Sequence, residues 1–149
     1  MTRKEIAMEN FGKGYNCSQS VVLAFSDLFG LPDDVLAKLA SSFGGGMGRM
    51  REVCGAVSGM SIVLGLLYGY DNPQAVTEKS AHYERIQNAA KAFEDENGSY
   101  ICRKLLNLPE GPDSPVPEKR TDAYYRKRPC KELVGSAAEI LDRIIKEDC

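Results

Sequence analysis

The sequence predicts an all-α fold, a compact single domain of about six helices over residues 1–149. Apolar residues recur at helical spacing in most segments, and residues that favour helix starts and ends separate these segments. No convincing run of alternating apolar and polar residues predicts a strand. A chain of 149 residues is long enough to bury a sizeable core, so a small helical bundle is the expected architecture.

The N-terminal part is predicted to form short helical segments over residues 2–11, 17–29 and 32–43. Asn16 is the expected N-cap of the second segment, because Gln19 stands three residues later as in a capping box. Gly30 is a suitable C-cap for this segment. Pro32 and the two aspartates after it favour the start of the third segment, where acidic side chains meet the positive helix end.

A glycine-rich turn is expected at residues 44–48, since glycine is costly inside regular structure. A strongly apolar helix is predicted to follow over residues 52–70. Its glycines form two pairs that are four residues apart, Gly55 with Gly59 and Gly65 with Gly69. Each pair lies on one helix face, so each is expected to let another backbone approach closely.

The C-terminal part is predicted to contain helices over residues 73–96, 100–108 and 130–148. Pro73 and Pro129 open the first and last of these, and Ser99 is the expected cap of the middle one. Residues 107–129 hold five of the seven prolines, which predicts an irregular excursion over the surface.

Charge and hydropathy exclude several classes of function. The formal net charge of −2 argues against general binding to nucleic acid. The first residues lack the apolar core of a signal peptide, so a cytoplasmic location is expected. Residues 53–70 carry no charged side chain and reach the minimum length of a spanning helix. Their glycines and serines, and the lack of a basic flank, favour a buried core helix and no membrane span.

Four of the five cysteines are predicted to lie in or near the first turn of a helix: Cys17, Cys54, Cys102 and Cys130. A helix N-terminus lowers the pKa of a thiol and stabilises the thiolate, which attacks disulfides and binds metals. No pair has the Cys-x-x-Cys spacing, so a shared site must be assembled by the fold. Four separately buried packing cysteines are the alternative. Cys149, the last residue, is left out of the site, with its role open.

Other candidate sites are weaker. The segment "GGGMGRM" lacks the Lys-Ser/Thr of a phosphate-binding loop. Glu78 and the single histidine, His82, are four residues apart and could form a ligand pair, but a solvated helix face is the favoured interpretation. We therefore expect no nucleotide site and no Ser/His/Asp arrangement.

Several segments resemble the C_GCAxxG_C_C family of redox-active proteins. They are "YNCSQSVVLAF", "FGGGMGRMREVCGAVSGMSIVLGLLYG", "ICRKLL" and "PCKELV", from about residue 14 to residue 145. The family motif CGAxxG corresponds to Cys54–Gly59, and the four cysteines of the family pattern all occur in the expected order along the chain. A related domain accompanies the haem part of split-Soret cytochromes, where an iron–sulfur cluster is implied. The resemblance therefore implies cluster ligands at Cys17, Cys54, Cys102 and Cys130, and covalent haem is not expected because Cys-x-x-Cys-His is absent.

The leading hypothesis is electron transfer or redox sensing through a [2Fe–2S] cluster, or another metal, on the four cysteines. One alternative is a thiol–disulfide oxidoreductase in which Cys54 attacks and a second cysteine resolves. Another is a structural or trafficked Zn²⁺ on the same thiols, in a module that serves a transporter, which the resemblance suggests because many members lie near transporter genes. Whether the chain is an enzyme stays open. Whether the thiols hold any cofactor at all also stays open. The expected partner is an unidentified redox protein, and a homodimer is left open.

Overall fold

The computed structural model describes residues 1–148 and confirms the all-α prediction. Its α-helices are α1 (Arg3–Gly12), α2 (Cys17–Leu23), α3 (Asp33–Ala40), α4 (Gly44–Met47), α5 (Gly55–Tyr68), α6 (Val76–Asn97), α7 (Cys102–Leu105), α8 (Asp122–Lys127) and α9 (Cys130–Glu147). Short 3-10 turns follow α2 and α3, at Ser26–Leu28 and Ser41–Phe43. In this described part, the extended backbone pairing consists of one isolated antiparallel bridge between Val53 and Ile101. Cys149 lies outside the described residues.

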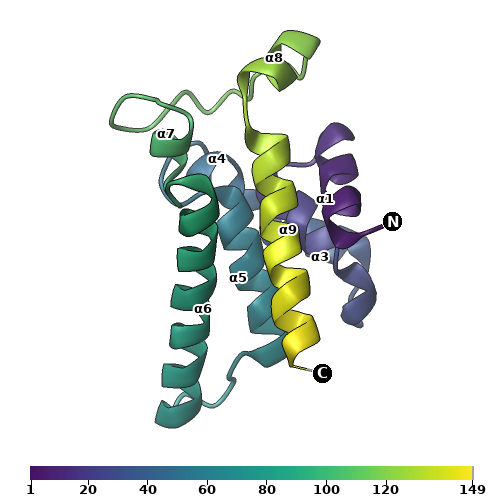
Figure 1. Ribbon diagram of the computed structural model, residues 1–149, viewed down its shortest axis with the longest axis vertical. Helices are drawn as coiled ribbons and strands as arrows, with labels where there is room; N and C mark the ends of the chain where they lie inside the picture. Colours follow the sequence, from purple (N-terminus) through teal and green to yellow (C-terminus); the bar gives the residue numbers. More distant parts are fainter. Residues whose placement is uncertain (149) are drawn as a thin grey trace.

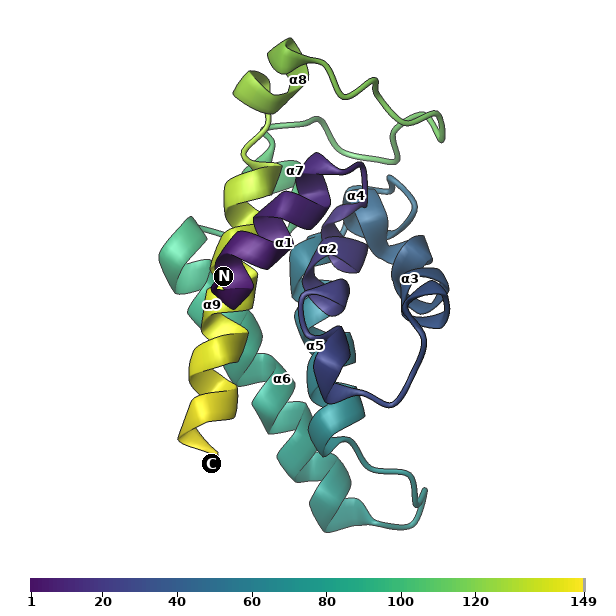
Figure 2. The same ribbon diagram turned by 90° about the vertical axis from the view of Figure 1, so that its right-hand side faces the viewer.

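The last helix packs against four other helices. Helix α9 packs against α1, α2, α5 and α6, while α2 packs closely against α5. Figures 1 and 2 show α5, α6 and α9 running along the long axis, with α8 and the segment before it over one end. The largest fully buried side chains come from several helices: Phe11, Phe25, Leu36, Met60, Leu64, Phe93, Ile140 and Leu141. The core therefore holds fixed the N-terminal ends of α2, α5 and α9.

The first glycine pair of α5 has the packing role that the sequence predicts. A Cβ atom at Gly55 would lie 3.0 Å from the Cβ of Cys17, and one at Gly59 would lie 2.9 Å from the Cβ of Val21. Both positions face α2, so the absence of side chains lets the two helices approach closely. This contact holds Cys17 near the start of α5.

The second glycine pair does not have that role, and the prediction for it was wrong. Helix α5 ends at Tyr68, so Gly69 is the C-cap and lies beyond the helix. A Cβ at Gly65 would meet only the Nε2 atom of His82, at 4.0 Å. A spacing of four residues marks a close helix contact only where both glycines stay within the helix and face a neighbour.

Several element boundaries differ from the predicted ones. Helix α2 has the predicted capping box at Asn16 and Gln19, but it ends at Leu23, before the expected stop at Gly30. Helix α6 begins three residues after Pro73, because a turn precedes it. Local propensity locates helices better than it locates their ends.

One prediction about the region after α6 was wrong, and another was incomplete. Ser99 does not cap α7, because its hydroxyl accepts a hydrogen bond from the Ile101 N–H, and α7 starts only at Cys102. The Pro-rich excursion over residues 107–129 also contains the short helix α8, whose N-cap Thr121 accepts a hydrogen bond from the Tyr124 N–H. Residues 107–121, which precede this helix, are called the strap below.

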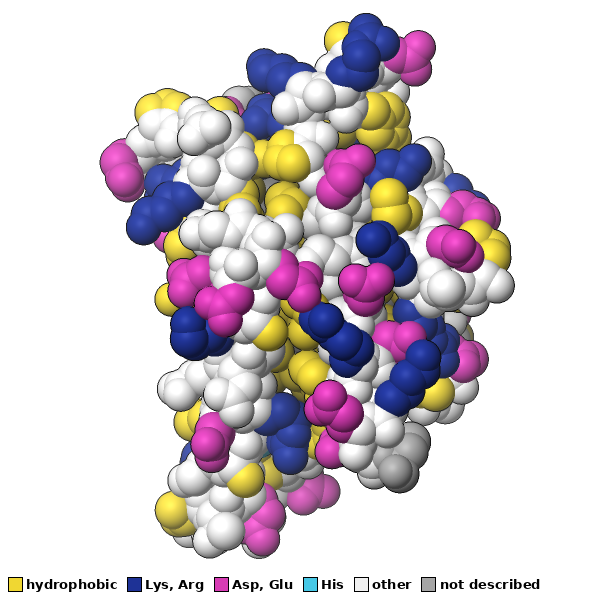
Figure 3. Space-filling view, in the orientation of Figure 1, with side chains coloured by type: hydrophobic (Ala, Val, Ile, Leu, Met, Phe, Trp, Pro, Cys, Tyr) yellow, Lys and Arg dark blue, Asp and Glu magenta, His cyan; other side chains and the backbone are white. Residues whose placement is uncertain are grey.

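Within residues 1–148, no helix is both long and apolar enough to cross a membrane. The face shown in Figure 3 carries interspersed acidic and basic side chains along its length, with several basic ones at the end near α8. The apolar segment of residues 53–70 is instead part of the core, where Ala56, Met60, Val63 and Leu64 are fully buried.

Candidate cysteine site

Each of the four family cysteines lies at the start of a helix, as the sequence predicts. Cys17, Cys102 and Cys130 are the first residues of α2, α7 and α9, and Cys54 is the N-cap of α5. Cys54, Cys102 and Cys130 are buried, whereas Cys17 is partly exposed, and all four are free thiols. The cysteines therefore lie at helix starts, where the backbone dipoles favour an anion.

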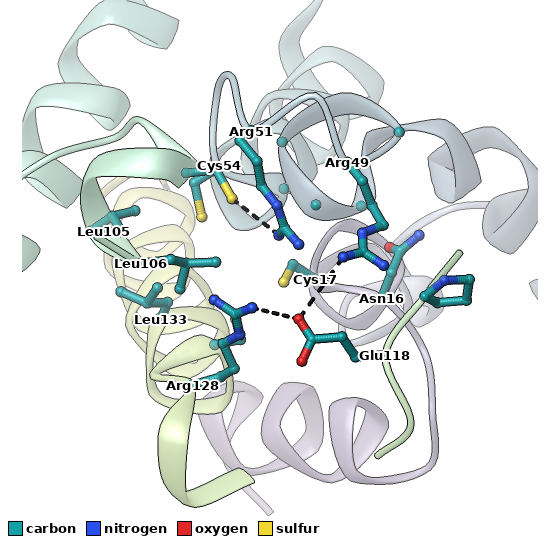
Figure 4. Close-up of a pocket in the computed structure, with 18 of the residues that line it drawn as sticks. Asn16, Cys17, Arg49, Arg51, Cys54, Leu105, Leu106, Glu118, Arg128 and Leu133 are labelled. Atoms are coloured by element: carbon teal, nitrogen blue, oxygen red, sulfur yellow. Dashed lines mark hydrogen bonds and ion pairs between the residues drawn. The ribbon is translucent and has the colours of Figure 1, made fainter. Parts of the chain in front are cut away.

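The fold brings these four cysteines to a single cavity of about 280 Å³. Figure 4 shows Cys17 and Cys54 at this cavity, with arginine side chains turned towards its centre. The other lining residues include four glycines of the predicted turn, arginines and apolar side chains: Gly44, Gly45, Gly46, Gly48, Arg49, Arg51, Leu105, Leu106, Arg120, Tyr124, Arg128 and Leu133. Segments that are more than a hundred residues apart in the sequence thus form one candidate site.

The glycine-rich turn is left-handed, which explains its composition. Gly45, Gly46, Met47, Gly48 and Arg49 all have φ between 58° and 71°. Gly46 also lies against the cysteine site, since a Cβ there would be 2.6 Å from the Glu52 nitrogen and 2.7 Å from the Cys102 Cβ. The predicted turn is therefore confirmed, and it forms one wall of the cavity.

A short backbone pairing places Cys54 and Cys102 on the same side. The Cys54 N–H donates to the Tyr100 carbonyl at 2.8 Å, and the Cys102 N–H donates to the Glu52 carbonyl at 2.6 Å. These bonds flank the bridge between Val53 and Ile101. Since side chains alternate across extended backbone, Cys54 and Cys102 lie on the same face of this pairing.

Cys17 and Cys130 form the second pair, in which the thiol of Cys17 hydrogen-bonds to the sulfur of Cys130. This bond raises the pKa of Cys17, and burial raises it further. The same bond lowers the pKa of Cys130, and the positive charges of Arg128, Arg51 and Arg120 lower it further. The pair therefore favours a thiolate at Cys130 beside a protonated Cys17.

The other two thiols are held mainly in the neutral form. Burial raises the pKa of Cys54 to about 12 and outweighs its hydrogen bonds from the backbone of α5. Burial also raises the pKa of Cys102, although Arg51 opposes this shift. The Nη1 atom of Arg51 lies 3.7 Å from the Cys102 sulfur. Helix starts thus lower these thiol pKa values less than predicted, because desolvation acts against them.

The arginines do not contact the cysteines that lie nearest to them in the sequence. Arg103, next to Cys102 in sequence, pairs instead with Glu52 at 2.7 Å. Arg51, three residues before Cys54, contacts Cys102. Arg128 lies at the cavity and pairs with Glu118 of the strap. The basic residues near the cysteines could be found from the sequence, but their partners depend on contacts between distant segments.

The strap is anchored over the cavity at several points. Asp113 accepts hydrogen bonds from Arg49 and Arg51, and its own N–H donates to the Arg49 carbonyl at 2.9 Å. Arg120 donates to the Phe11 carbonyl at 2.9 Å, and its guanidinium stacks 4.0 Å from the Phe11 ring centroid. Arg120 was not predicted as a site residue, because only tertiary packing brings it near the cysteines.

The weaker candidate, His82, is remote from this cavity. It is buried on α6, where its Nδ1 atom lies 3.0 Å from Arg85 and its ring meets Tyr70 edge-on. Burial lowers its pKa. The expectation that His82 lies on a solvated helix face was therefore wrong, because its side chain is buried.

The described donors do not form a site for one metal ion. Within residues 1–148, no group of three or more His, Cys, Asp or Glu side chains is close enough to hold one. The four family cysteines are instead arranged as two pairs around a common cavity.

A family model described as "Putative redox-active protein (C_GCAxxG_C_C)" matches residues 15–144. The chain belongs to this family. The matched range includes all four cysteines of the cavity and excludes Cys149. No curated protein and no solved structure matches the chain.

The structure explains the spacing of the C_GCAxxG_C_C family motif in this chain. Cys54 caps α5, while Gly55 and Gly59 provide the close contact with α2 that brings Cys17 to the same cavity. Ala56, which follows Gly55 in the motif, is fully buried. The motif thus combines one sulfur with the packing surface that positions another.

Replacing Gly46 with alanine is expected to destabilise the protein by more than the matched change at Gly48. Both residues have left-handed φ, so either alanine costs about 1–2 kcal/mol in backbone strain. A Cβ at Gly48 meets nothing within 4 Å, whereas one at Gly46 clashes with Glu52 and Cys102. Urea unfolding of both variants tests this, and equal losses of stability would contradict the close approach.

Proposed function

We propose that this protein transfers electrons or senses redox state through an iron–sulfur cluster held by Cys17, Cys54, Cys102 and Cys130. One observation carries the proposal: cysteines from four separate helix starts line a single cavity. Membership of a redox-active family supports the general function. The cluster and its ligands rest on the donor set and its arrangement.

The arrangement in pairs fits a [2Fe–2S] cluster better than one metal ion. Such a cluster takes two thiolates at each iron, so two cysteine pairs can serve it without three donors meeting at one point. A structural zinc ion requires four sulfurs around one centre at about 2.3 Å. Zinc on Cys₄, whether structural or in transit, is therefore the less favoured use of the same residues.

The surrounding residues also suit a cluster with a net negative charge. Arg49, Arg51 and Arg128 place positive charge at the cavity, and Gly44–Gly48 expose backbone at its wall. When bound, a cluster of this type would supply one-electron transfer. The arginines would stabilise the ligated thiolates, and the strap would limit the access of water.

Protein prepared without air is expected to be coloured, with visible absorption that is lost on reduction by dithionite. Thiolate-ligated iron–sulfur clusters absorb visible light, whereas zinc does not, so the spectrum separates the two cofactors. The absorption should return on mild reoxidation, because the proposed function requires a reversible couple. A colourless preparation with four reactive cavity thiols would refute the cluster.

A second candidate is a thiol–disulfide oxidoreductase, and the hydrogen-bonded pair of Cys17 and Cys130 favours it. In that reaction the Cys130 thiolate attacks a disulfide of the substrate and releases one substrate thiolate. The Cys17 sulfur then attacks the mixed disulfide, which releases the second substrate thiol and leaves a Cys17–Cys130 disulfide. The two cysteines lose two electrons, which reduce the substrate. Cys54, the expected attacker, suits the role less well because burial raises its pKa to about 12.

In the reduced, metal-free protein, Cys130 is expected to be alkylated fastest and Cys54 slowest. A lowered pKa gives Cys130 a larger thiolate fraction at neutral pH, whereas Cys54 gains a thiolate only as the pH approaches 12. Mass spectrometry of iodoacetamide-labelled peptides between pH 6 and pH 10, a range chosen to bracket ordinary thiols, gives the order. Faster labelling of Cys54 would restore it as the attacking residue.

The remaining assignments are proposals that follow from this function. An electron-transfer protein needs a redox partner protein, which the family resemblance connects with a transporter system. A cytoplasmic location agrees with four free thiols, since that compartment keeps cysteines reduced. A homodimer would be compatible with either function.

A further inference from the structure

The cavity has a strongly basic side formed by three arginines. The side chains of Arg49, Arg51 and Arg128 are 14%, 9% and 7% exposed. Figure 4 shows their charged groups turned towards the same region, with Arg128 beside Leu106 and Leu133 and Arg49 across from them. Guanidinium groups that are so far removed from water need anionic partners, because an unpaired buried charge is very costly.

The anionic partners come from the strap. Glu118 lies between Arg128, with which it forms a hydrogen bond, and Arg49, whose Nη2 atom is 3.9 Å away. Asp113 accepts hydrogen bonds from Arg51 at 3.0 Å and from Arg49 at 3.1 Å. Two carboxylates thus face three guanidinium groups, of which that of Arg51 also lies 3.7 Å from the Cys102 sulfur.

The pairing also leaves donor capacity unused. The Nε atom of Arg49 is buried and has no hydrogen-bond partner within the described residues. A guanidinium group offers a planar fork of donors that matches the two oxygens of a carboxylate or the oxygens of a phosphate. The basic side of the cavity can therefore accept a further oxyanion.

Glu118 is the group that such an anion would replace. Its side chain is 38% exposed, although its partner Arg128 is buried. It belongs to the strap, between Pro117 and the exposed Lys119, and not to a core helix. Its carboxylate can therefore leave the arginines for solvent at a much smaller cost than either arginine could.

We propose that the basic side of the cavity binds a small molecule bearing a carboxylate or another oxyanion group, and that Glu118 occupies this position in its absence. The oxyanion pairs with Arg128 and Arg49. An apolar remainder of the ligand packs against Leu105, Leu106 and Leu133, which line the same cavity. None of these contacts uses a cysteine, so binding of the anion can be measured separately from the cluster, which would share the same cavity.

Titration calorimetry with three probes tests the proposal: benzoate, its neutral counterpart benzamide, and inorganic phosphate. Benzoate is expected to bind and benzamide to bind at least about tenfold more weakly, since a charge-assisted pair contributes about 1.5–3 kcal/mol. Stronger binding of benzoate than of phosphate would assign the site to carboxylates with an apolar part. The reverse order would assign it to phosphate-bearing ligands.

Glu118→Gln is the decisive variant, because it removes the competing charge and keeps the size of the side chain. It should raise the affinity for the preferred anion by about tenfold, because the anion no longer has to displace a charged carboxylate from the arginines. Arg128→Gln should lower that affinity by a similar factor. Arg143→Gln is the matched control, since Arg143 pairs with Glu96 elsewhere on α9 and should leave binding unchanged.

Equal binding of benzoate and benzamide would overturn the proposal, as would no binding of either anion. An unchanged affinity in Glu118→Gln would do so as well. A gain of affinity in this variant requires a folded protein, so misfolding cannot imitate the expected result. Iron content measured on the same samples reports separately on the cluster, and either proposal can therefore fail without the other.

Discussion

Replacing Cys130 with serine is expected to remove essentially all iron from protein prepared without air. Cys130 is the cysteine best suited to be a thiolate in this cavity, since Cys17 hydrogen-bonds to it and three arginines lower its pKa. Serine keeps the size of the side chain but is a poor ligand for iron that thiolates otherwise hold. The iron content per chain and the visible spectrum measure the loss.

Two controls make this result interpretable. Cys149→Ser changes a cysteine outside the family match, so it should keep the full iron content. Circular dichroism should show that Cys130→Ser retains its helices, because Cys130 is the first residue of α9 and serine keeps the size of the side chain. Full iron retention in Cys130→Ser would remove this cysteine from the ligand set and leave three family cysteines for the site.

Replacing Gly59 with leucine is expected to destabilise the protein by about 3 kcal/mol, the upper part of the usual range for overpacking. A Cβ at Gly59 already lies 2.9 Å from the Cβ of Val21 and 3.0 Å from the Ser18 carbonyl oxygen. A leucine therefore forces α2 away from α5. Since α2 begins with Cys17, this variant should also weaken the binding of iron.

The matched control lies on the same helix. Gly65→Leu introduces the same side chain where a Cβ meets only one atom, at 4.0 Å, so its free energy of unfolding should change by less than about 1 kcal/mol. Chemical unfolding of both variants compares the two positions. Similar losses at Gly59 and Gly65 would contradict the close packing of α2 against α5.

Most of the fold could be predicted because its signals are local. The capping box of Asn16 and Gln19 and the apolar face of residues 130–148 each involve residues within one helix. The start of α9 after Pro129 is signalled in the same way. Helix α8 was missed because prolines surround it, although its N-cap Thr121 followed by Asp122 is a recognisable signal.

The candidate site was only partly predictable. The helix-start position of Cys17 follows from the local cap at Asn16, and that of Cys130 follows from Pro129, whereas the cap expected before Cys102 was wrong. Their arrangement as two pairs depends on the bridge between Val53 and Ile101 and on the contact of α2 with α5 and α9. The pairing of Arg51 with Cys102, and the approach of Glu118 to Arg49, involve segments about 50 or more residues apart.

The most direct test of the account is the amount of iron and acid-labile sulfide per chain in protein purified without air. A [2Fe–2S] cluster on two cysteine pairs predicts about two iron atoms and two sulfides per chain. Zinc at one atom per chain without sulfide would contradict the cluster and support a Cys₄ metal site. The absence of both iron and zinc, together with a Cys17–Cys130 disulfide that forms reversibly, would contradict the cluster and support dithiol chemistry.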